Sequence, residues 1–375
     1  MNTIYKTADE FAREQERIIS TGPDKYNSFV TYRQIVANYI KSLYSGERPM
    51  GWCSFSAPFE LLTAMGVSPS IVELFAAAFS TLGIIEEYID EAEHAGYVPE
   101  MCTYHRSVLG AILKGHLPEP KFVVATSSPC TSNIAMMEKI ARIFKKELFI
   151  IQIPQFYSER SIEVLAGQLK DLMDFMALHT GNPVDKEKLY EVVTKTNETR
   201  DYLVKIFNLA KHRPSPIVGE ELRGLSYALD LLMGTDDALR VVKLYFDDFT
   251  DRISRLDRLA SDEKLRLLWI QGRIFFKNSI EALLREKYGV VIVAHGLNNI
   301  YWEPIDPEDP YRGFAKRMMT YPLHGPIENY IRHLQKMAAD YTVYGAICVS
   351  IWGCRHGCGS RGLFTDAMKN IGVPV

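Results

Sequence analysis

The order of apolar and polar positions divides the chain into two segments of alternating strands and helices with a helical stretch between them. The β-branched run Lys121–Thr126 and the apolar run Glu147–Ile153 predict two strands. Between them, Asn133–Lys146 carries apolar residues at helical spacing and predicts a helix. A strand, a helix and a strand in this order form a βαβ unit, so the sequence predicts a parallel sheet.

The middle of the chain, from Ser158 to about Asp262, has an almost purely helical pattern. It is interrupted at His212–Pro216, where two prolines end any helix. The expected helices on either side of this break are Ser161–Leu178, Asp185–Lys211, Gly219–Met233 and Asp236–Leu259.

Strands and helices alternate again in the last third of the chain. The expected elements are the strands Leu265–Ile270, Val290–Ala294 and Gly345–Ile351, and the helices Phe275–Tyr288, Ile327–Tyr341 and Gly362–Ile371. With the polar and helical N-terminal stretch, the chain then has four parts: residues 1–49, a first α/β lobe at 50–157, a helical linker at 158–262, and a second α/β lobe at 263–375. We therefore expect two similar α/β lobes with parallel sheets, joined by helices.

Composition and charge exclude several classes of function. The 375 residues, 47% hydrophobic and 24% charged, are typical of a globular protein with two or three domains. A formal charge of −3 offers no electrostatic footprint for nucleic acid or an anionic membrane. The most apolar stretch, Val67–Ile85, is interrupted by Pro69 and Glu73, and the N-terminus has no apolar signal core. We expect a cytoplasmic protein with a small-molecule substrate and neither a nucleic-acid nor a membrane partner.

The cysteines are too few for a disulfide scaffold, but their placement is uneven. Three lie in the first 130 residues, three in the last 28, and none in the 217 residues between. This split favours two halves that fold around one shared site. The six residues are Cys53, Cys102, Cys130, Cys348, Cys354 and Cys358.

Several of these cysteines follow predicted strands, where open α/β sheets bind their ligands. Cys130 comes just after the strand that ends at Thr126, while Cys354 and Cys358 follow the strand that contains Cys348, on a glycine-rich turn. Zinc sites are typically built from paired C-x2-C motifs, which neither end of the chain has. Iron–sulfur clusters accept thiolates from separate loops. The competing interpretation, reduced cysteines buried in the core, is the stronger one for any single cysteine and the weaker one for all six together.

Four stretches resemble the 2-hydroxyacyl-CoA dehydratase / benzoyl-CoA reductase family. They are GWCSFSAPFELLTAMGVSP (Gly51–Pro69), PEMCTYHRSVLG (Pro99–Gly110), VVATSSPCTSN (Val123–Asn133) and IWGCRHGCGSRG (Ile351–Gly362). The resemblance implies two Rossmann-like (flavodoxin-like) lobes with an iron–sulfur cluster in the crevice between them. It also implies that the first three cysteines, Cys53, Cys102 and Cys130, hold one [4Fe–4S] cluster.

The second cysteine triplet makes the chain more similar to the double-cubane cluster proteins, a branch of that family with an [8Fe–9S] cluster. In such a cluster each of the two cubanes needs three protein thiolates. The six cysteines of this chain, with Cys348, Cys354 and Cys358 as the second triplet, match that number. This resemblance implies a homodimeric reductase that receives electrons from an ATP-hydrolysing [4Fe–4S] activator protein. One alternative is a dehydratase or benzoyl-CoA reductase subunit with a single [4Fe–4S] cluster, and another is a non-enzymatic electron-transfer or cluster-carrying protein. About eight, four or no irons per chain would separate these hypotheses.

Candidate proton donors lie beside the cysteines. Glu60 belongs to the resembling stretch, His105 follows Cys102 by three residues, and His356 lies between Cys354 and Cys358. Imidazole titrates near neutral pH and suits proton transfer. The alternatives are a carboxylate that stabilises a helix N-terminus and two surface histidines. No phosphate-binding loop of the pattern G-x4-G-K-[ST] occurs, so ATP is not expected to bind. Neither the HGLNN segment (His295–Asn299) nor Gln271–Arg273 forms a G-x-G-x-x-G fingerprint, so a dinucleotide is not expected to bind either.

The end of the sequence departs from the family pattern. Family members continue past the strand that matches Val373–Val375 with a further loop and helix. Either the sequence is truncated, or this chain closes its second lobe differently.

Overall fold

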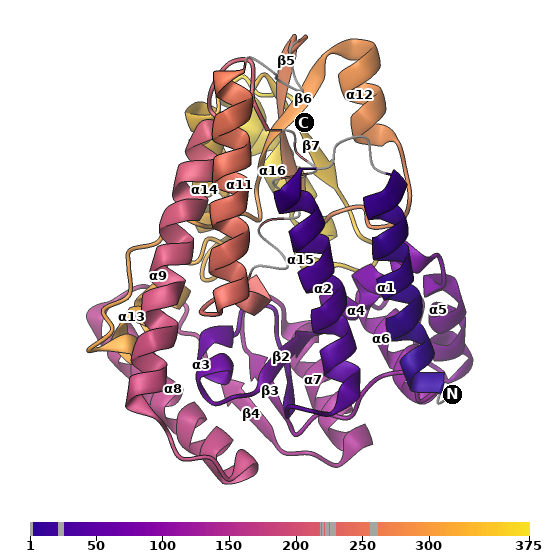
Figure 1. Ribbon diagram of the computed structural model, residues 1–375, viewed down its shortest axis with the longest axis vertical. Helices are drawn as coiled ribbons and strands as arrows, with labels where there is room; N and C mark the ends of the chain where they lie inside the picture. The colour runs from indigo at the N-terminus through magenta and orange to yellow at the C-terminus, as the bar shows by residue number, and fades with distance from the viewer. Residues whose placement is uncertain are drawn as a thin grey trace.

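Two parallel sheets, one in each half of the molecule, organise the fold seen in the computed structural model (Figure 1). The structure describes residues 3–21, 26–217, 219, 221, 225, 230–255 and 262–375. The first sheet has the strand order β2-β1-β3-β4, with β1 Met50–Cys53, β2 Ser68–Ile71, β3 Phe122–Thr126 and β4 Leu148–Ile151. The second has the order β6-β5-β7, with β5 Leu265–Gln271, β6 Val290–His295 and β7 Gly345–Val349. Each strand pair is parallel.

Four of the strands are buried along their whole length. Every residue of β1, β2, β3 and β6 is buried, and β1, β3 and β6 are mostly apolar without alternation, whereas β2 buries a proline and two serines. The helices of the first half are α3 Phe59–Ala64, α4 Val72–Leu82, α5 Ile85–His94, α6 Thr103–Leu113, α7 Thr131–Phe144 and α8 Glu159–Thr180. Gly110 of α6 lies against α5, where a Cβ would come within 1.8 Å of the Tyr88 carbonyl oxygen.

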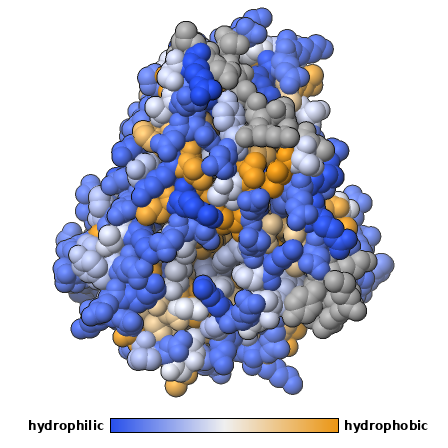
Figure 2. All heavy atoms as spheres, viewed as in Figure 1, coloured by the Kyte–Doolittle hydropathy of each residue, from blue (hydrophilic) through white to orange (hydrophobic). Residues whose placement is uncertain are grey.

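Four long helices run along the molecule and span both halves (Figure 1). They are α1 Thr3–Thr21, α2 Asn27–Ser45, α9 Lys186–Leu209 and α11 Asp236–Ser254. The side chains of Asp185 and Thr235 begin two of them by accepting the Lys188 and Ala238 N–H groups at 3.0 and 3.2 Å. The face in Figure 2 is mostly hydrophilic, with apolar residues gathered in its middle, around α2 and α11.

The second half adds further helices, and one of them ties the halves together. They are α12 Ile280–Tyr288, α13 Pro310–Met319, α14 Ile327–Asp340, α15 Arg355–Gly359 and α16 Arg361–Lys369. α13 packs against α8 and α9, so part of the C-terminal segment lies on helices that follow the first sheet. No helix in the described part of the chain combines the length and apolarity needed to cross a membrane.

The expected α/β class with parallel sheets is confirmed, while several boundaries differ. The helix expected from Phe275 begins at Ile280, and the turn expected after Cys354 is the short helix α15. The expected helix Gly219–Met233 lies largely outside the described residues. The segment Val373–Val375 forms no strand, although the Pro374 carbonyl accepts the Ala346 N–H at 2.8 Å beside β7.

Candidate functional site

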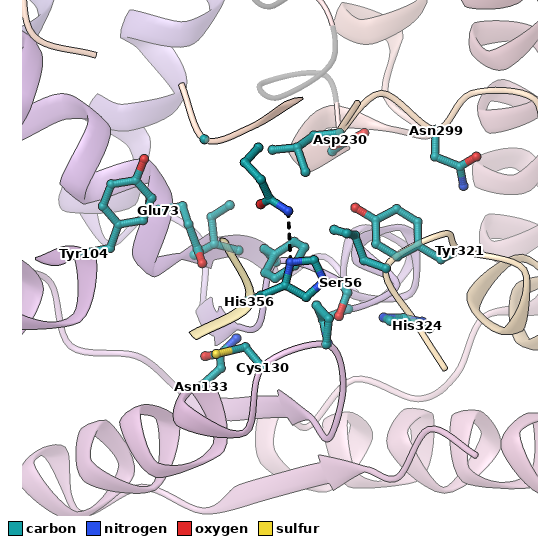
Figure 3. Close-up of a pocket in the computed structure, with 18 of the residues that line it drawn as sticks. Ser56, Glu73, Tyr104, Cys130, Asn133, Asp230, Asn299, Tyr321, His324 and His356 are labelled. Carbon is teal, nitrogen blue, oxygen red and sulfur yellow. Dashed lines mark hydrogen bonds between the residues drawn. The ribbon is translucent and has the colours of Figure 1, made fainter. Parts of the chain in front are cut away.

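A cavity of about 230 Å³ lies where the carboxyl ends of the two sheets face each other. Its wall includes the segments that directly follow β1, β2, β3, β5, β6 and β7, such as Phe55–Ala57 and Gln271–Arg273. Ligands bind at these strand ends in α/β sheets. Figure 3 shows Cys130 and Asn133 at one end of this cavity and Asp230, Asn299 and Tyr321 at the other.

Three cysteines from the two halves line this cavity. Cys102, Cys130 and Cys354 do so, and each is the residue that caps the N-terminus of a helix, namely α6, α7 and α15. The backbone N–H groups at a helix N-terminus stabilise negative charge, including that of a thiolate. Gly357 donates such an N–H group to the Cys354 sulfur at 3.2 Å.

Two of these thiols are brought together by a close approach of the loops that carry them. Gly353 has φ 74°, and a Cβ there would lie 2.5 Å from the carbonyl carbon of Met101 and 2.6 Å from the Cys102 nitrogen. Only glycine allows this backbone conformation and this contact without strain. As a result, the Cys354 sulfur interacts electrostatically with those of Cys102 and Cys130.

Burial keeps the thiols of Cys102 and Cys354 protonated in the absence of a metal. It raises the pKa of Cys102 to about 12 against the opposing effect of the His105 and Tyr104 N–H groups, and it raises the pKa of Cys354. No three His, Cys, Asp or Glu side chains among the described residues are arranged to hold a single ion. A cluster takes each thiolate on a different iron and so uses ligands that stand further apart. Three thiols at the edge of one cavity, each at a helix N-terminus, are a donor set of the kind that an iron–sulfur cluster takes.

The remaining cysteines lie outside the cavity wall. Cys53 is fully buried at the end of β1, with its sulfur 3.5 Å from the Gly51 carbonyl oxygen, and burial raises its pKa. Cys348 lies half-buried in β7, and Cys358 is exposed and hydrogen-bonds the Ile351 carbonyl oxygen at 3.1 Å. The structure thus unites two cysteines of the first triplet with one of the second.

Three carboxyl groups line the same cavity in three different environments. Glu60 forms a buried two-pronged ion pair with Arg317, with N···O distances of 2.5 and 2.9 Å. Burial raises the pKa of Asp230 to about 7, against the opposing charges of Arg273 and Arg317. Burial likewise raises the pKa of Glu73 to about 7, and its Oε2 has no hydrogen-bond partner among the described residues.

Histidines of both halves face the cavity in their neutral form. Burial lowers the pKa of His105 to about 4, and it also lowers the pKa of His356, whose Nδ1 lies 3.1 Å from the Gln271 amide nitrogen. His324 is 2% exposed, with Nδ1 2.7 Å from the Met318 carbonyl oxygen and its pKa lowered to about 4. At neutral pH these imidazoles are therefore uncharged, and they do not hold the extra proton of an acid.

Several lining residues were missed from the sequence. Glu73 is the charged residue that interrupts the apolar stretch Val67–Ile85, and a lone carboxylate in such a run is a usable signal. His324 follows the break Tyr321–Pro322 and belongs to no motif. Asp230 and Arg317 stand in helical patterns where a solvent-facing charge looks the same, so no local signal separates them.

The fold and the cavity define a two-lobed α/β protein with thiols from both lobes around a shared site. Residues 53–375 match the family described as "2-hydroxyglutaryl-CoA dehydratase, D-component". The chain belongs to this family. This confirms the resemblance at family level; the double-cubane branch stays a prediction.

Named relatives are components of dehydratases and of a reductase. The chain is 27% identical to the (R)-phenyllactyl-CoA dehydratase alpha subunit of Clostridium sporogenes over 60% of its own length and 57% of that protein. It is 22% identical to the alpha subunit of the lactoyl-CoA dehydratase of Anaerotignum propionicum over 58% and 57%. It is 23% identical to one of the subunits of the benzoyl-CoA reductase of Thauera aromatica over 76% and 72%. The match to the two dehydratase subunits spans a little over half of their length.

Proposed function

We propose that this chain is the cluster-bearing subunit of an acyl-CoA dehydratase, with a single [4Fe–4S] cluster held by Cys102, Cys130 and Cys354. The observation that carries the proposal is the convergence on one cavity of three thiols from both halves, each on the residue at the N-cap position of a helix. When bound, such a cluster supplies single-electron transfer at a potential set by its hydrogen bonds and its exposure.

The chain's own side chains supply the polar chemistry of the cavity. Glu73 has neither an ion-pair partner nor a hydrogen-bond donor at Oε2 among the described residues, so its carboxyl can hold and release a proton near neutral pH. Glu60 is engaged in its buried ion pair with Arg317, which fixes the position of α13 relative to α3. We therefore assign proton transfer to Glu73 in preference to Glu60, with His105 and His356 as uncharged imidazoles in the wall of the same cavity.

The double-cubane hypothesis receives less support from the geometry than the single-cluster alternative. It requires thiolates from Cys53, Cys348 and Cys358, none of which lines the cavity. The burial of Cys53 in the core favours the interpretation of this cysteine as a packing residue.

A reductase of the benzoyl-CoA type is the second candidate. It is supported by the longest of the matches described above, which covers 321 residues. Both activities would use the same thiols and would act on an acyl thioester. Because the relatives are named as single subunits of larger enzymes, we expect a partner subunit, and the ATP-hydrolysing activator implied by the resemblance is expected as the electron donor. A second copy of this chain stays an alternative to a different partner subunit.

The test is an iron count combined with ligand binding. The protein is reconstituted with iron and sulfide without oxygen, and we expect about four irons per chain and the EPR signal of a reduced [4Fe–4S] cluster. Addition of phenyllactyl-CoA or benzoyl-CoA should change that signal if the thioester binds beside the cluster. About eight irons per chain would favour the double cubane, and no iron would refute the proposal.

A further inference from the structure

A contact between two loops far apart in the sequence lies directly beside the thiols. The indole Nε1 of Trp352 donates a hydrogen bond to the Pro99 carbonyl oxygen at 2.8 Å. The Trp352 carbonyl oxygen accepts two more, from the Thr103 N–H at 3.1 Å and from the Thr103 hydroxyl at 3.0 Å. These three bonds join the loop after β7, in the second half, to the loop before α6, in the first.

The position of this contact relates it to the cysteines. Thr103 is the neighbour of Cys102, and Trp352 precedes Cys354 by two residues. Between them, Gly353 lies so close to Met101 and Cys102 that no side chain would fit there. The two cysteines are therefore held near each other by this contact and by no other hydrogen bond between these two loops that the structure describes.

Core packing does not explain the placement of Trp352. The side chain is 66% exposed, although tryptophan is a large apolar residue that packing normally buries. A side chain this exposed removes little apolar area from water, so its directional hydrogen bond contributes more to its orientation. An exposed tryptophan whose N–H reaches across to the other half suits a fastening role.

We propose that Trp352 is a positioning residue that fastens the Cys354 loop to the Cys102 loop and so holds the third thiolate of the cluster site in place. The inference rests on the proposed function, because it assigns Cys354 to the cluster. Two of the three thiols belong to the first half and one to the second, so separation of the two loops would leave a cluster with two protein ligands. Release of iron should then depend on how often this contact opens.

The size of the effect follows from the bonds that are lost. Trp352→Phe keeps an aromatic ring and removes the N–H donor, and Thr103→Val removes the hydroxyl donor while keeping the shape of the side chain. Loss of one such bond should make opening about fivefold more frequent, which is about 1 kcal/mol at 1.36 kcal/mol per tenfold. Thr365→Val is the matched control, since the Thr365 hydroxyl bonds the Arg361 carbonyl oxygen within α16, outside this contact.

The experiment measures the rate at which reconstituted protein loses iron to bathophenanthroline disulfonate without oxygen. We expect Trp352→Phe and Thr103→Val to lose iron about fivefold faster than wild type, with a changed EPR signal of the reduced cluster, and Thr365→Val to match wild type. The melting temperature of the iron-free protein should fall by no more than about 2–4 °C in each variant, the control included, because each loses one hydrogen bond, so a difference in iron release separates positioning from general destabilisation. Iron release at the wild-type rate in Trp352→Phe would overturn the proposal, and Thr103→Val decides in the same way if Trp352→Phe does not fold.

A failure of the proposed function is distinguishable from a failure of this inference. If wild-type protein binds no iron, the proposed function fails, and the contact is tested by hydrogen exchange of the Thr103 amide in iron-free protein. Exchange about fivefold faster in Trp352→Phe would then support the fastening role. Unchanged exchange would refute it.

Discussion

The carboxyl of Glu73 should make the stability of the protein depend on pH in a direction that is unusual for a carboxylate. Burial raises its pKa in the folded protein from 4.5 to about 7, and no cation contributes to the shift. Between pH 4.5 and 7 the folded state therefore binds more protons than the unfolded state. The free energy of unfolding falls as pH rises through this window, and the loss is complete above pH 7.

The magnitude follows from the same shift. At 1.36 kcal/mol for each pKa unit, a fully buried carboxyl of this kind would lower the free energy of unfolding by up to about 3 kcal/mol at pH 8. Glu73 lies partly open to the cavity, which reduces the expected loss to about 2 kcal/mol. Glu73→Gln keeps the shape of the side chain and removes the titration. It should stabilise the protein by about this amount at pH 8 and leave it nearly unchanged at pH 4.5.

Urea denaturation of the iron-free protein between pH 4.5 and 8 measures this difference. Asp230, whose pKa is also raised to about 7, acts equally in wild type and variant, so the difference between the two curves isolates Glu73. The exposed Glu308→Gln is the control and should give a curve parallel to that of wild type. Parallel curves for wild type and Glu73→Gln would refute the assignment of Glu73 as a cavity carboxyl that holds its proton.

Two further predictions concern the contacts between the halves. Glu60→Ala leaves the Arg317 guanidinium without its buried partner and should lower the free energy of unfolding by about 3–5 kcal/mol. The double variant with Arg317→Met should recover most of this loss, and equal destabilisation of the single and the double variant would contradict the prediction. Gly353→Ala forces a side chain into a positive φ and against the Cys102 loop, so it should cost at least about 1 kcal/mol and reduce bound iron. Gly359→Ala, with open space around its Cβ, should retain its iron, and equal iron in both alanine variants would speak against the loop contact.

The sequence allowed the α/β architecture to be predicted because several strands are long enough to carry a signal. β3, β5 and β6 are runs of five to seven residues, mostly apolar, bounded by polar residues or glycine. β1 and β2 have four residues each, and β2 contains a proline and two serines, so neither stands out from a loop. Their strand state depends on burial and on pairing, of β1 with β3 and of β2 with β1, which the local sequence does not record.

The sequence predicted that cysteines from both ends of the chain meet at one site, but it did not predict which of the six line the cavity. Cys53 and Cys130 each lie in a stretch that resembles the family pattern, yet Cys53 ends its strand inside the core and Cys130 caps a helix at the cavity. The contact of Trp352 with Pro99 joins residues 253 apart and leaves no local trace. Contacts of this kind depend on how the two halves of the folded chain pack together, and hydrophobic periodicity and residue spacing do not encode that packing.

The most direct test of the central claim is the iron content of single cysteine variants after reconstitution without oxygen. Cys102→Ser, Cys130→Ser and Cys354→Ser should each lose most of the about four irons expected for wild type, because each removes a thiolate from the cavity. Cys348→Ser and Cys358→Ser should keep their iron. Cys53→Ser should keep it as well, at a cost of about 1–3 kcal/mol in stability for a hydroxyl in the core. Loss of iron in Cys53→Ser together with full iron in Cys354→Ser would contradict the account.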